Sequence, residues 1–386
     1  MIPTQTLFSN RFKLTEILFI NRPKALNSIN TEICKIMLSK LDDFNKFPTR
    51  TSCFMLKGVG GKAFCAGGDV KSVVTDLASQ PASSDKERSF FSTEYKMNYE
   101  LSKCKVPQIS IWDGVVMGGG VGISIFGKYR IATEKTLFAM PETAIGLFPD
   151  VGSSFWLAKL NRGVGQYIGL TGCRLKYQDL VNLGIATHYI PSEKLDLFET
   201  SVVNEMISES SEINSSILED ILKRYANVSK INHPISKLSF DINRIFNESE
   251  NVEEIFMKLE LYNGENSDWA ASTLTALKKA SPTSLKLTFQ QIKTAQQKNL
   301  NLRECLKMVY FLYSFNFYSH SKCILKEYRM VKRCLLGNDF KEGVRALLID
   351  KDQNPKWSPL KLQDISADFI NSYFETFSNP KDELEL

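Results

Sequence analysis

The chain has few histidines and no closely spaced cysteines. Only three of its 386 residues are histidine (His188, His233 and His320), which argues against a histidine-rich metal site. Its eight cysteines are scattered and none belongs to a CxxC pair, a pattern typical of buried thiols in a reducing compartment. We therefore expect neither a bound metal nor a disulfide framework.

Long apolar runs and a strong net charge are also absent. The least polar window, residues 106–127, contains Asp113 and six glycines, so we expect no membrane span. Lysine and arginine exceed aspartate and glutamate by five (48 − 43) without a dominant basic block. This predicts no nucleic-acid partner, although it suits an anionic small ligand. Residues 1–14 contain only two cations and make a poor targeting presequence.

Strands, glycine loops and helices alternate through the first half of the chain. This alternation is typical of βαβ units around a buried parallel sheet. The second half is mainly helical, apart from a short strand at 186–190, and we place the boundary at residue 200. The patterns predict strands at 12–20, 53–57, 107–112, 129–132 and 137–139, and helices at 31–44, from 70, at 89–102 and from the glycine run 114–122.

Two glycine loops each follow a strand and precede a helix, at residues 60–69 (GGKAFCAGGD) and 117–122 (MGGGVG). Glycine lets the backbone approach a ligand closely, and a helix N-terminus presents free N–H groups. Two such loops facing each other would hold a carbonyl oxygen that becomes negative during a reaction. Tight packing or phosphate binding is the alternative explanation for either loop alone.

A third segment, residues 140–150 (MPETAIGLFPD), supplies acid–base groups. Glu142 and Asp150 lie among apolar neighbours and beside two prolines that fix the backbone. Carboxylates in such surroundings have shifted proton affinities, which suits general acid or base chemistry. In isolation, a helix-capping glutamate and a turn-starting aspartate would explain the same residues.

Together these segments resemble the crotonase (enoyl-CoA hydratase/isomerase) superfamily, and most closely its 3-hydroxyisobutyryl-CoA hydrolase branch. The resemblance implies an α/β fold, a crotonase-like ββα superhelix with a helical C-terminal region. Residues 1–200 would form the core with both loops and the acid pair, and residues 201–386 would complete the fold. The matching stretches cover nearly the whole chain: 21–27 (NRPKALN), 61–69, 117–122, 132–135 (ATEK), 138–152, 170–172, 281–285 (SPTSL), 339–346 (DFKEGVRA) and 350–352.

The resemblance implies a role for each matching residue. The backbone N–H groups of Ala66 and Gly119 would form an oxyanion hole for the thioester carbonyl of an acyl-CoA. Glu142 matches the family's catalytic glutamate, and Asp150 matches the acid that marks the hydrolases. Glu94 matches a further acid that contacts the substrate. We hypothesise that Glu142 attacks the acyl carbon or activates water, while Asp150 binds the 3-hydroxyl group and assists proton transfer.

Four further residues match substrate-binding positions of the family. Gly67 and Gly68 continue the first glycine loop, and Lys24 and Lys62 sit where family members place groups near the CoA nucleotide. Solvated lysines without a ligand are the alternative for the last two. Cys65 lies in the same loop, where a small buried filler is a simpler explanation than a nucleophile.

One departure separates the chain from the hydratases. Hydratases place a second glutamate two residues after their glycine triplet, where this chain has Gly122. They also usually have glycine at the position of Asp150. Adding water across a double bond between two flanking carboxylates is therefore disfavoured, and both differences favour thioester hydrolysis.

We therefore expect an enzyme that hydrolyses a short-chain 3-hydroxyacyl-CoA, with 3-hydroxyisobutyryl-CoA in valine catabolism as the substrate that the resemblance implies. CoA enters as part of the substrate, and no resident cofactor is expected. The family implies a mitochondrial location, and the sequence leaves a homo-oligomer open. Two alternatives remain: another crotonase-fold hydratase or isomerase, and a non-catalytic component of the mitochondrial small ribosomal subunit.

Residues 309–326 (VYFLYSFNFYSHSKCILK) interrupt the family pattern with six aromatics in eighteen residues. An apolar loop on a soluble surface is a liability unless it meets a partner. We hypothesise that this atypical insertion is a retained intron translated in frame, because valine codons begin with GT and a lysine codon can end in AG. An oligomer contact or a membrane-touching loop are the alternatives.

Overall fold

The computed structural model describes residues 5–79, 85–207, 211–226, 234–299 and 317–386. Its contacts divide the chain into two compact units, each built from separate segments. Unit 1 comprises Met1–Asp69, Lys96–Phe138 and Arg174–His233, and unit 2 comprises Val70–Tyr95, Ala139–Cys173 and Pro234–Leu386. The boundary predicted at residue 200 falls inside helix α8 (Leu195–Glu205) of unit 1.

Unit 1 is built on a six-stranded sheet in the order β1-β2-β3-β5-β7-β9. β1 pairs antiparallel with β2, and every later pair is parallel, which confirms the predicted parallel sheet. The strand predicted at 12–20 begins only at Thr15, because Lys13 has a left-handed backbone (φ +52°) and turns the chain. The strands are β1 (Leu7–Phe12), β2 (Thr15–Ile20), β3 (Cys53–Gly58), β5 (Gln108–Trp112), β7 (Tyr129–Ala132) and β9 (His188–Tyr189).

A second sheet has three short strands that follow the glycine-rich sequence: β4 (Ala63–Cys65), β6 (Val115–Met117) and β8 (Leu137–Ala139). β4 and β6 are parallel. The sequence predicted loop for residues 63–65 and a helix from 114, so both predictions were wrong at these positions. Three-residue strands are too short to show an alternating pattern, and the surrounding glycines concealed them.

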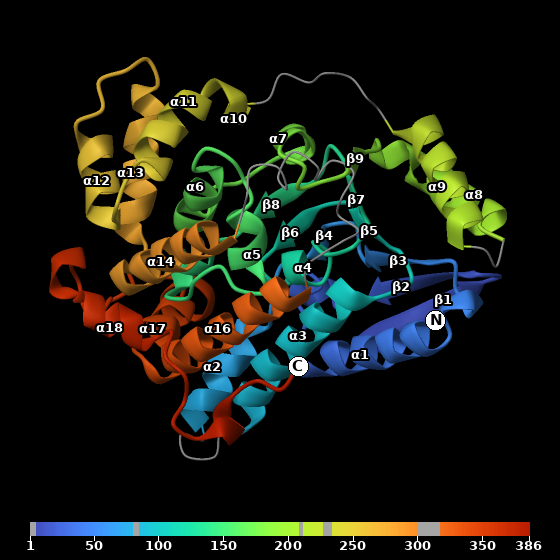
Figure 1. Ribbon diagram of the computed structural model, residues 1–386, viewed down its shortest axis with the longest axis horizontal. Coiled ribbons are helices and arrows are strands. Elements are labelled where there is room, and N and C mark those ends of the chain that lie inside the picture. The colour runs from blue at the N-terminus through green and yellow to red at the C-terminus, as the bar shows by residue number, and fades with distance from the viewer. Residues whose placement is uncertain (1–4, 80–84, 208–210, 227–233, 300–316) are drawn as a thin grey trace. The chain divides into compact units, whose positions relative to one another are not determined.

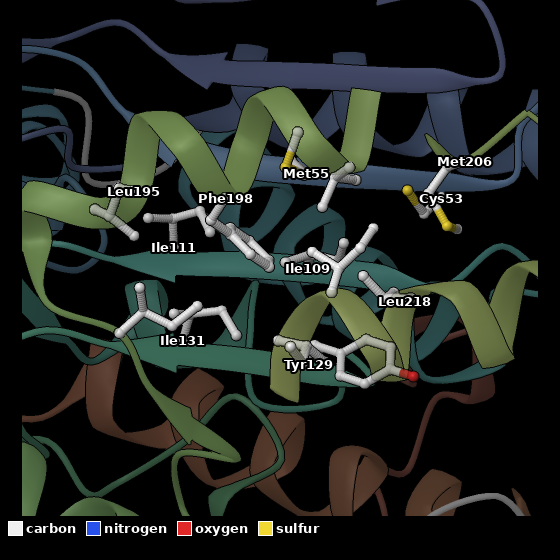
Figure 2. Packing of buried hydrophobic residues seen from close by; sticks show 14 of the residues in the cluster. Cys53, Met55, Ile109, Ile111, Tyr129, Ile131, Leu195, Phe198, Met206 and Leu218 are labelled. Carbon is white, nitrogen blue, oxygen red and sulfur yellow. The ribbon is translucent and has the colours of Figure 1, made fainter. Parts of the chain in front are cut away.

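Two helices cover one face of the main sheet in unit 1. Figure 2 shows α8 and α9 (Ser211–Tyr225) packing their apolar side chains against strands β3, β5 and β7. The first long helix, α1 (Thr31–Lys46), starts where it was predicted, and the side chain of Asn30 accepts a hydrogen bond from the Ile33 amide. The other helices of unit 1 are η1 (Pro23–Ala25), η2 (Pro48–Arg50), α4 (Gly119–Gly122), α7 (Tyr177–Asn182) and η4 (Ser192–Lys194).

Unit 2 is helical, as the second half of the sequence predicted. Helix α14 packs on α5 and α6, and α16 packs on α5 (Figure 1). Its helices are α2 (Val70–Ser79), the first part of α3 (Asp85–Lys103), η3 (Glu142–Ile145), α5 (Ser153–Leu157), α6 (Val164–Thr171), α10 (Pro234–Lys237), α11 (Ser239–Ile242), η5 (Asn243–Asn247), α12 (Val252–Glu260), α13 (Ser267–Lys279), α14 (Pro282–Asn299), α16 (Phe317–Leu336), α17 (Asp339–Val344), η6 (Arg345–Ile349), η7 (Leu362–Asp364), α18 (Ala367–Ser372) and η8 (Pro380–Asp382).

The atypical insertion at 309–326 is described only in part. Residues 309–316 lie outside the described residues, and residues 317–326 form the start of α16. The intron hypothesis and its alternatives therefore stay predictions. No helix in the described ranges has the length and apolar character needed to cross a membrane.

Candidate active site

The two glycine loops come together within unit 1. Because β4 and β6 are paired and parallel, the loops that follow them leave the same edge of the small sheet. A Cβ atom on Gly67 (φ +117°) would lie 3.5 Å from the carbonyl oxygen of Met117, and one on Gly120 would lie 2.2 Å from that of Cys65. Position 120 therefore accepts only glycine, because any side chain would overlap the Cys65 carbonyl oxygen. Gly119 is the first residue of α4 and is buried beside this contact.

The amide of Ala66 already has a partner. Its N–H donates a hydrogen bond of 3.0 Å to the carbonyl oxygen of Leu26. Leu26 and Asn27 both have left-handed backbones (φ +50° and +58°). The buried Asn27 side chain stabilises this turn by donating to the carbonyl oxygens of Val59 and Ala63, each at 2.8 Å. To act in an oxyanion hole, the Ala66 amide must therefore give up its hydrogen bond to the Leu26 carbonyl oxygen and donate to a substrate oxygen instead.

The predicted nucleotide-binding lysines lie on the surface of unit 1. Lys24 belongs to η1 and Lys62 precedes β4, and both side chains are exposed. The neighbouring Arg22 is instead used in the fold, since it forms an ion pair of 2.7 Å with Asp69. This pair ties the 21–27 stretch to the end of the first glycine loop.

The three predicted acids come together within unit 2. Glu94 lies on α3, Glu142 is the first residue of η3, and Asp150 lies just before α5. Their exposed fractions are only 2%, 5% and 4%. One carboxylate oxygen of Glu94 (Oε1) and one of Glu142 (Oε2) are buried without a hydrogen-bond partner. Buried carboxylate oxygens are rarely left unpaired, so this arrangement indicates a ligand-binding position.

Burial and mutual repulsion shift the proton affinities of these acids. Burial, followed by the charge of Asp150, raises the pKa of Glu142 well above its ordinary value. Burial and the charges of Asp150 and Glu142 do the same to the pKa of Glu94. Burial raises the pKa of Asp150 to about 6, although a hydrogen bond from Tyr95 opposes the shift. The pKa values of all three acids are therefore raised, a direction of shift that suits general acid–base chemistry.

Two residues that the sequence did not single out complete the acid cluster. The hydroxyl of Tyr95 donates a hydrogen bond of 2.7 Å to Oδ2 of Asp150. The carboxylate of Glu327, on α16, accepts hydrogen bonds from backbone amides that follow Asp150. Tyr95 adjoins the matched Glu94, and Glu327 directly follows the insertion at 309–326. Adjacency to recognised motifs was the only signal in the sequence for either residue.

The turn that carries Glu142 is braced by α17. A Cβ atom on Gly146 would lie 2.1 Å from the carbonyl oxygen of Asp339, and one on Gly343 would lie 2.4 Å from the carbonyl carbon of Ile145. Only glycine at these positions lets η3 and α17 approach so closely. The 339–346 stretch, which matched the family, therefore supports the position of the turn that carries Glu142.

Ser281 connects the same two elements with hydrogen bonds. Its backbone N–H donates to the carbonyl oxygen of Thr143 at 3.1 Å. Its hydroxyl donates to Oδ2 of Asp339 at 2.6 Å. The backbone N–H of Ser358 donates to the other oxygen of this carboxylate at 2.8 Å. The family-matching stretches at 281–285 and 339–346 thus meet at one buried aspartate.

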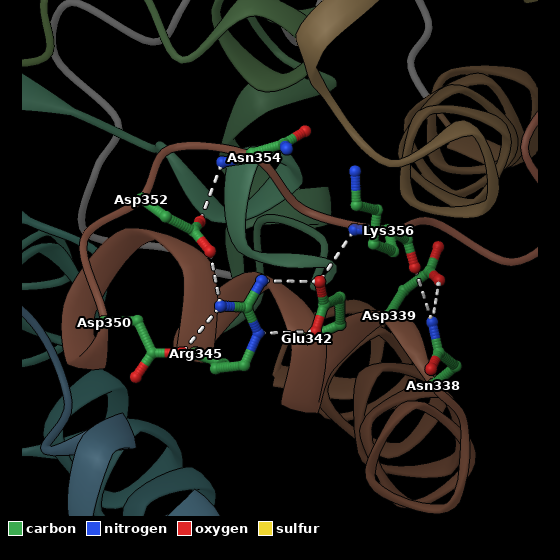
Figure 3. Close-up of polar contacts among 8 residues, drawn as sticks. All are labelled: Asn338, Asp339, Glu342, Arg345, Asp350, Asp352, Asn354 and Lys356. Atoms are coloured by element: carbon green, nitrogen blue, oxygen red, sulfur yellow. Dashed lines mark hydrogen bonds and ion pairs between the residues drawn. The ribbon is translucent and has the colours of Figure 1, made fainter.

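Arg345 fixes the chain that follows α17. Figure 3 shows its guanidinium group among three carboxylates. It donates to both oxygens of Glu342 at 2.8 Å, to Asp350 at 2.7 Å and to Asp352 at 2.6 Å. The backbone N–H of Lys356 donates to Glu342 at 2.7 Å. Asp350 and Asp352 of the matched 350–352 stretch therefore have a structural role as hydrogen-bond acceptors for Arg345.

Cys65 and Gly122 are both buried in unit 1. The Cys65 thiol donates to the carbonyl oxygen of Gly67 at 3.6 Å, which fits the packing role expected for it. Gly122, the last residue of α4, contributes no side chain where hydratases would have a second glutamate. Among the described residues, no group of histidine, cysteine, aspartate and glutamate side chains is arranged to hold a metal ion.

Comparisons with known proteins agree with the resemblance seen in the sequence. The family model described as enoyl-CoA hydratase/isomerase matches residues 15–374. The chain is 40% identical to a Xenopus laevis protein named 3-hydroxyisobutyryl-CoA hydrolase, mitochondrial, over 94% of this chain and 87% of that protein. It is 38% identical to the Dictyostelium discoideum protein of the same name, over 98% of this chain and 93% of that protein.

A solved structure confirms the expected fold. The crystal structure of a carnitinyl-CoA dehydratase from Mycobacterium thermoresistibile aligns over 99% of both chains, with a TM-score of 0.83 and 26% sequence identity. An agreement of this extent includes the α/β part and the helical C-terminal region. The α/β fold class predicted from the sequence is therefore confirmed.

Proposed function

Because the chain belongs to the enoyl-CoA hydratase/isomerase family, we propose that it hydrolyses 3-hydroxyisobutyryl-CoA to 3-hydroxyisobutyrate and CoA, a reaction of valine catabolism. The observation that carries this proposal is the buried group of acids that includes Glu142 and Asp150, with Gly122 in place of the hydratases' second glutamate. The names of the similar Xenopus and Dictyostelium proteins support the same substrate. Their names also support a mitochondrial location for this chain.

The proposed reaction adds water to a thioester and releases a thiol. The amides of Gly119 and Ala66 donate hydrogen bonds to the carbonyl oxygen as it becomes negative, and one such donor is typically worth about 3 kcal/mol in the transition state. In its ionised form, Glu142 either attacks the acyl carbon, giving an anhydride that water then hydrolyses, or removes a proton from the attacking water. The leaving thiolate of CoA takes up a proton. No serine or cysteine nucleophile is needed.

Asp150 gives the reaction its substrate preference. As a carboxylate it accepts a hydrogen bond from the 3-hydroxyl group of the acyl chain, and its pKa of about 6 leaves it mostly ionised at neutral pH. Glu94, whose raised pKa favours the protonated form, is able to donate a hydrogen bond to the same substrate. Lys24 and Lys62 contact the CoA phosphates. CoA belongs to the substrate, and the reaction uses no further cofactor.

Release of free thiol from 3-hydroxyisobutyryl-CoA tests this function. We expect turnover by the wild type and a loss of 10²- to 10⁴-fold in Glu142→Gln, the usual contribution of a positioned acid–base group. Glu193→Gln, an exposed glutamate in η4, is the matched control and should behave as wild type. Crotonyl-CoA should not be hydrated. A folded wild type that releases no thiol would refute the proposal and favour a non-catalytic role.

A single turnover in H₂¹⁸O with enzyme in excess tests for nucleophilic attack by Glu142. Attack by the carboxylate transfers ¹⁸O into the Glu142 side chain when water opens the anhydride at that carbon, or into the product when it opens at the acyl carbon. General-base catalysis places ¹⁸O only in 3-hydroxyisobutyrate. Mass spectrometry of the peptide that contains Glu142, after this single turnover, detects ¹⁸O in the side chain and so shows attack by the carboxylate.

A further inference from the structure

Helix α16 carries a buried carboxylate that has no role in the proposed reaction. The Glu327 side chain has no exposed surface. It accepts three hydrogen bonds, from the backbone N–H of Gly152 at 2.6 Å, from the backbone N–H of Ser154 at 3.0 Å and from the Ser154 hydroxyl at 2.5 Å. All three donors lie within four residues of Asp150. The carboxylate therefore holds the chain immediately after the proposed specificity residue.

That stretch of chain needs external support. Val151 and Gly152 are consecutive residues with left-handed backbones (φ +53° and +81°). A β-branched residue such as valine strongly disfavours this conformation, which persists only where surrounding contacts enforce it. Glu327 supplies such contacts after Asp150, and Gln291 supplies one before it by donating to the Pro149 carbonyl oxygen at 2.8 Å.

The same helix also contacts the tyrosine that orients the Asp150 carboxylate. The ring of Tyr328 packs edge-on against the ring of Tyr95, with centroids 6.2 Å apart. Tyr95 in turn donates its hydrogen bond to Oδ2 of Asp150. Two adjacent residues of α16 thus act on Asp150. Glu327 holds the backbone that follows Asp150, and Tyr328 packs against Tyr95, which donates a hydrogen bond to the Asp150 carboxylate.

The geometry points to Glu327 as a positioning residue that holds Asp150 where it receives the 3-hydroxyl group of the substrate. This inference rests on the proposed function and adds a determinant of substrate choice. Glu327 and Asp150 also interact electrostatically. Burial raises the pKa of Glu327 to about 8, the hydrogen bonds from Ser154 and Gly152 oppose this shift, and the charge of Asp150 adds to it.

The inference is tested by comparing turnover of two substrates. One is 3-hydroxyisobutyryl-CoA, and the other is isobutyryl-CoA, its analogue without the hydroxyl group. Glu327→Gln keeps the side-chain volume but places an amide where three donors converge. We expect up to about a 100-fold lower kcat for the hydroxylated substrate, the loss that a displacement of about 1 Å is able to cause, with KM within about twofold. The preference of Glu327→Gln for the hydroxylated substrate should fall. Ser154→Ala should lower the same preference by a smaller factor.

The matched control is Asp241→Asn. Asp241 is another buried carboxylate of unit 2, and it accepts hydrogen bonds from Tyr262 at 2.9 Å and Asn266 at 2.7 Å. This variant should keep the wild-type preference between the two substrates.

A Glu327→Gln enzyme with the wild-type kcat, or with equal losses on both substrates, would overturn the inference. Equal losses are the signature of a carboxylate that only stabilises the fold. If Glu327→Gln does not fold, Ser154→Ala decides, and an unchanged substrate preference in that variant would overturn the inference. A wild type that hydrolyses neither substrate would instead refute the proposed function on which the inference depends.

Discussion

Replacing Asp150 by asparagine should stabilise the protein in neutral and alkaline solution. Burial raises the pKa of Asp150 from 3.8 to about 6, so the folded protein disfavours the ionised form. The difference corresponds to about 3 kcal/mol of unfolding free energy. The wild type loses this amount as the pH rises from below 3.8 to above 6. Asparagine carries no charge and still accepts the Tyr95 hydrogen bond, so the variant avoids the loss.

Urea unfolding of wild type and Asp150→Asn at several pH values measures this effect. We expect the variant to be more stable by about 3 kcal/mol at pH 8, by roughly half of that at pH 5 and by almost nothing below pH 3.8. Asp241→Asn, which also removes a buried carboxylate of unit 2, is the control. Its unfolding free energy is measured at the same pH values.

An Asp150→Asn protein that is less stable than wild type at pH 8 would contradict this reasoning. So would a stability difference that does not change between pH 5 and pH 8. Either result would mean that the folded protein compensates the Asp150 charge. The acid cluster would then not be the electrostatically strained site on which the proposed chemistry depends.

Three further predictions concern other residues of the candidate site. Tyr95→Phe removes a hydrogen bond that lowers the pKa of Asp150, so the acid limb of the kcat profile should move to higher pH. Asn27→Ala removes two buried side-chain hydrogen bonds and should lower the unfolding free energy by about 2–4 kcal/mol, measurable by urea denaturation. Lys24→Ala and Lys62→Ala should raise KM for the CoA thioester, with kcat unchanged. They should leave KM for the corresponding pantetheine thioester, which lacks the nucleotide, at the wild-type value.

The sequence was informative where a chemical requirement fixes residue types at short spacing. Glu142 and Asp150 lie eight residues apart, each directly after a proline, and the structure places both in one buried cluster with Glu94. The glycines of the two loops were recognisable because close backbone contact excludes side chains. The Cβ distance at Gly120 shows that contact directly.

The sequence was uninformative where a role depends on contacts between distant segments. Glu327 lies 175 residues beyond Gly152 along the chain, yet it accepts a hydrogen bond from that residue. Nothing in the local pattern of α16 separates this glutamate from an exposed one. The Ala66 amide illustrates the same limit, because its bond to Leu26 depends on a turn whose two left-handed residues are not glycine.

The interleaved units set the order in which the protein folds during synthesis. The chain passes from one unit to the other at Asp69, Tyr95, Phe138, Cys173 and His233. Unit 1 has all its segments only after the ribosome has released residues up to 233. Unit 2 is completed only by the segment Pro234–Leu386. Until then Glu94, Glu142 and Asp150 have no Glu327 beside them. A chain that terminates early would expose those acids and the apolar surface around them, which makes it a substrate for chaperones or proteases.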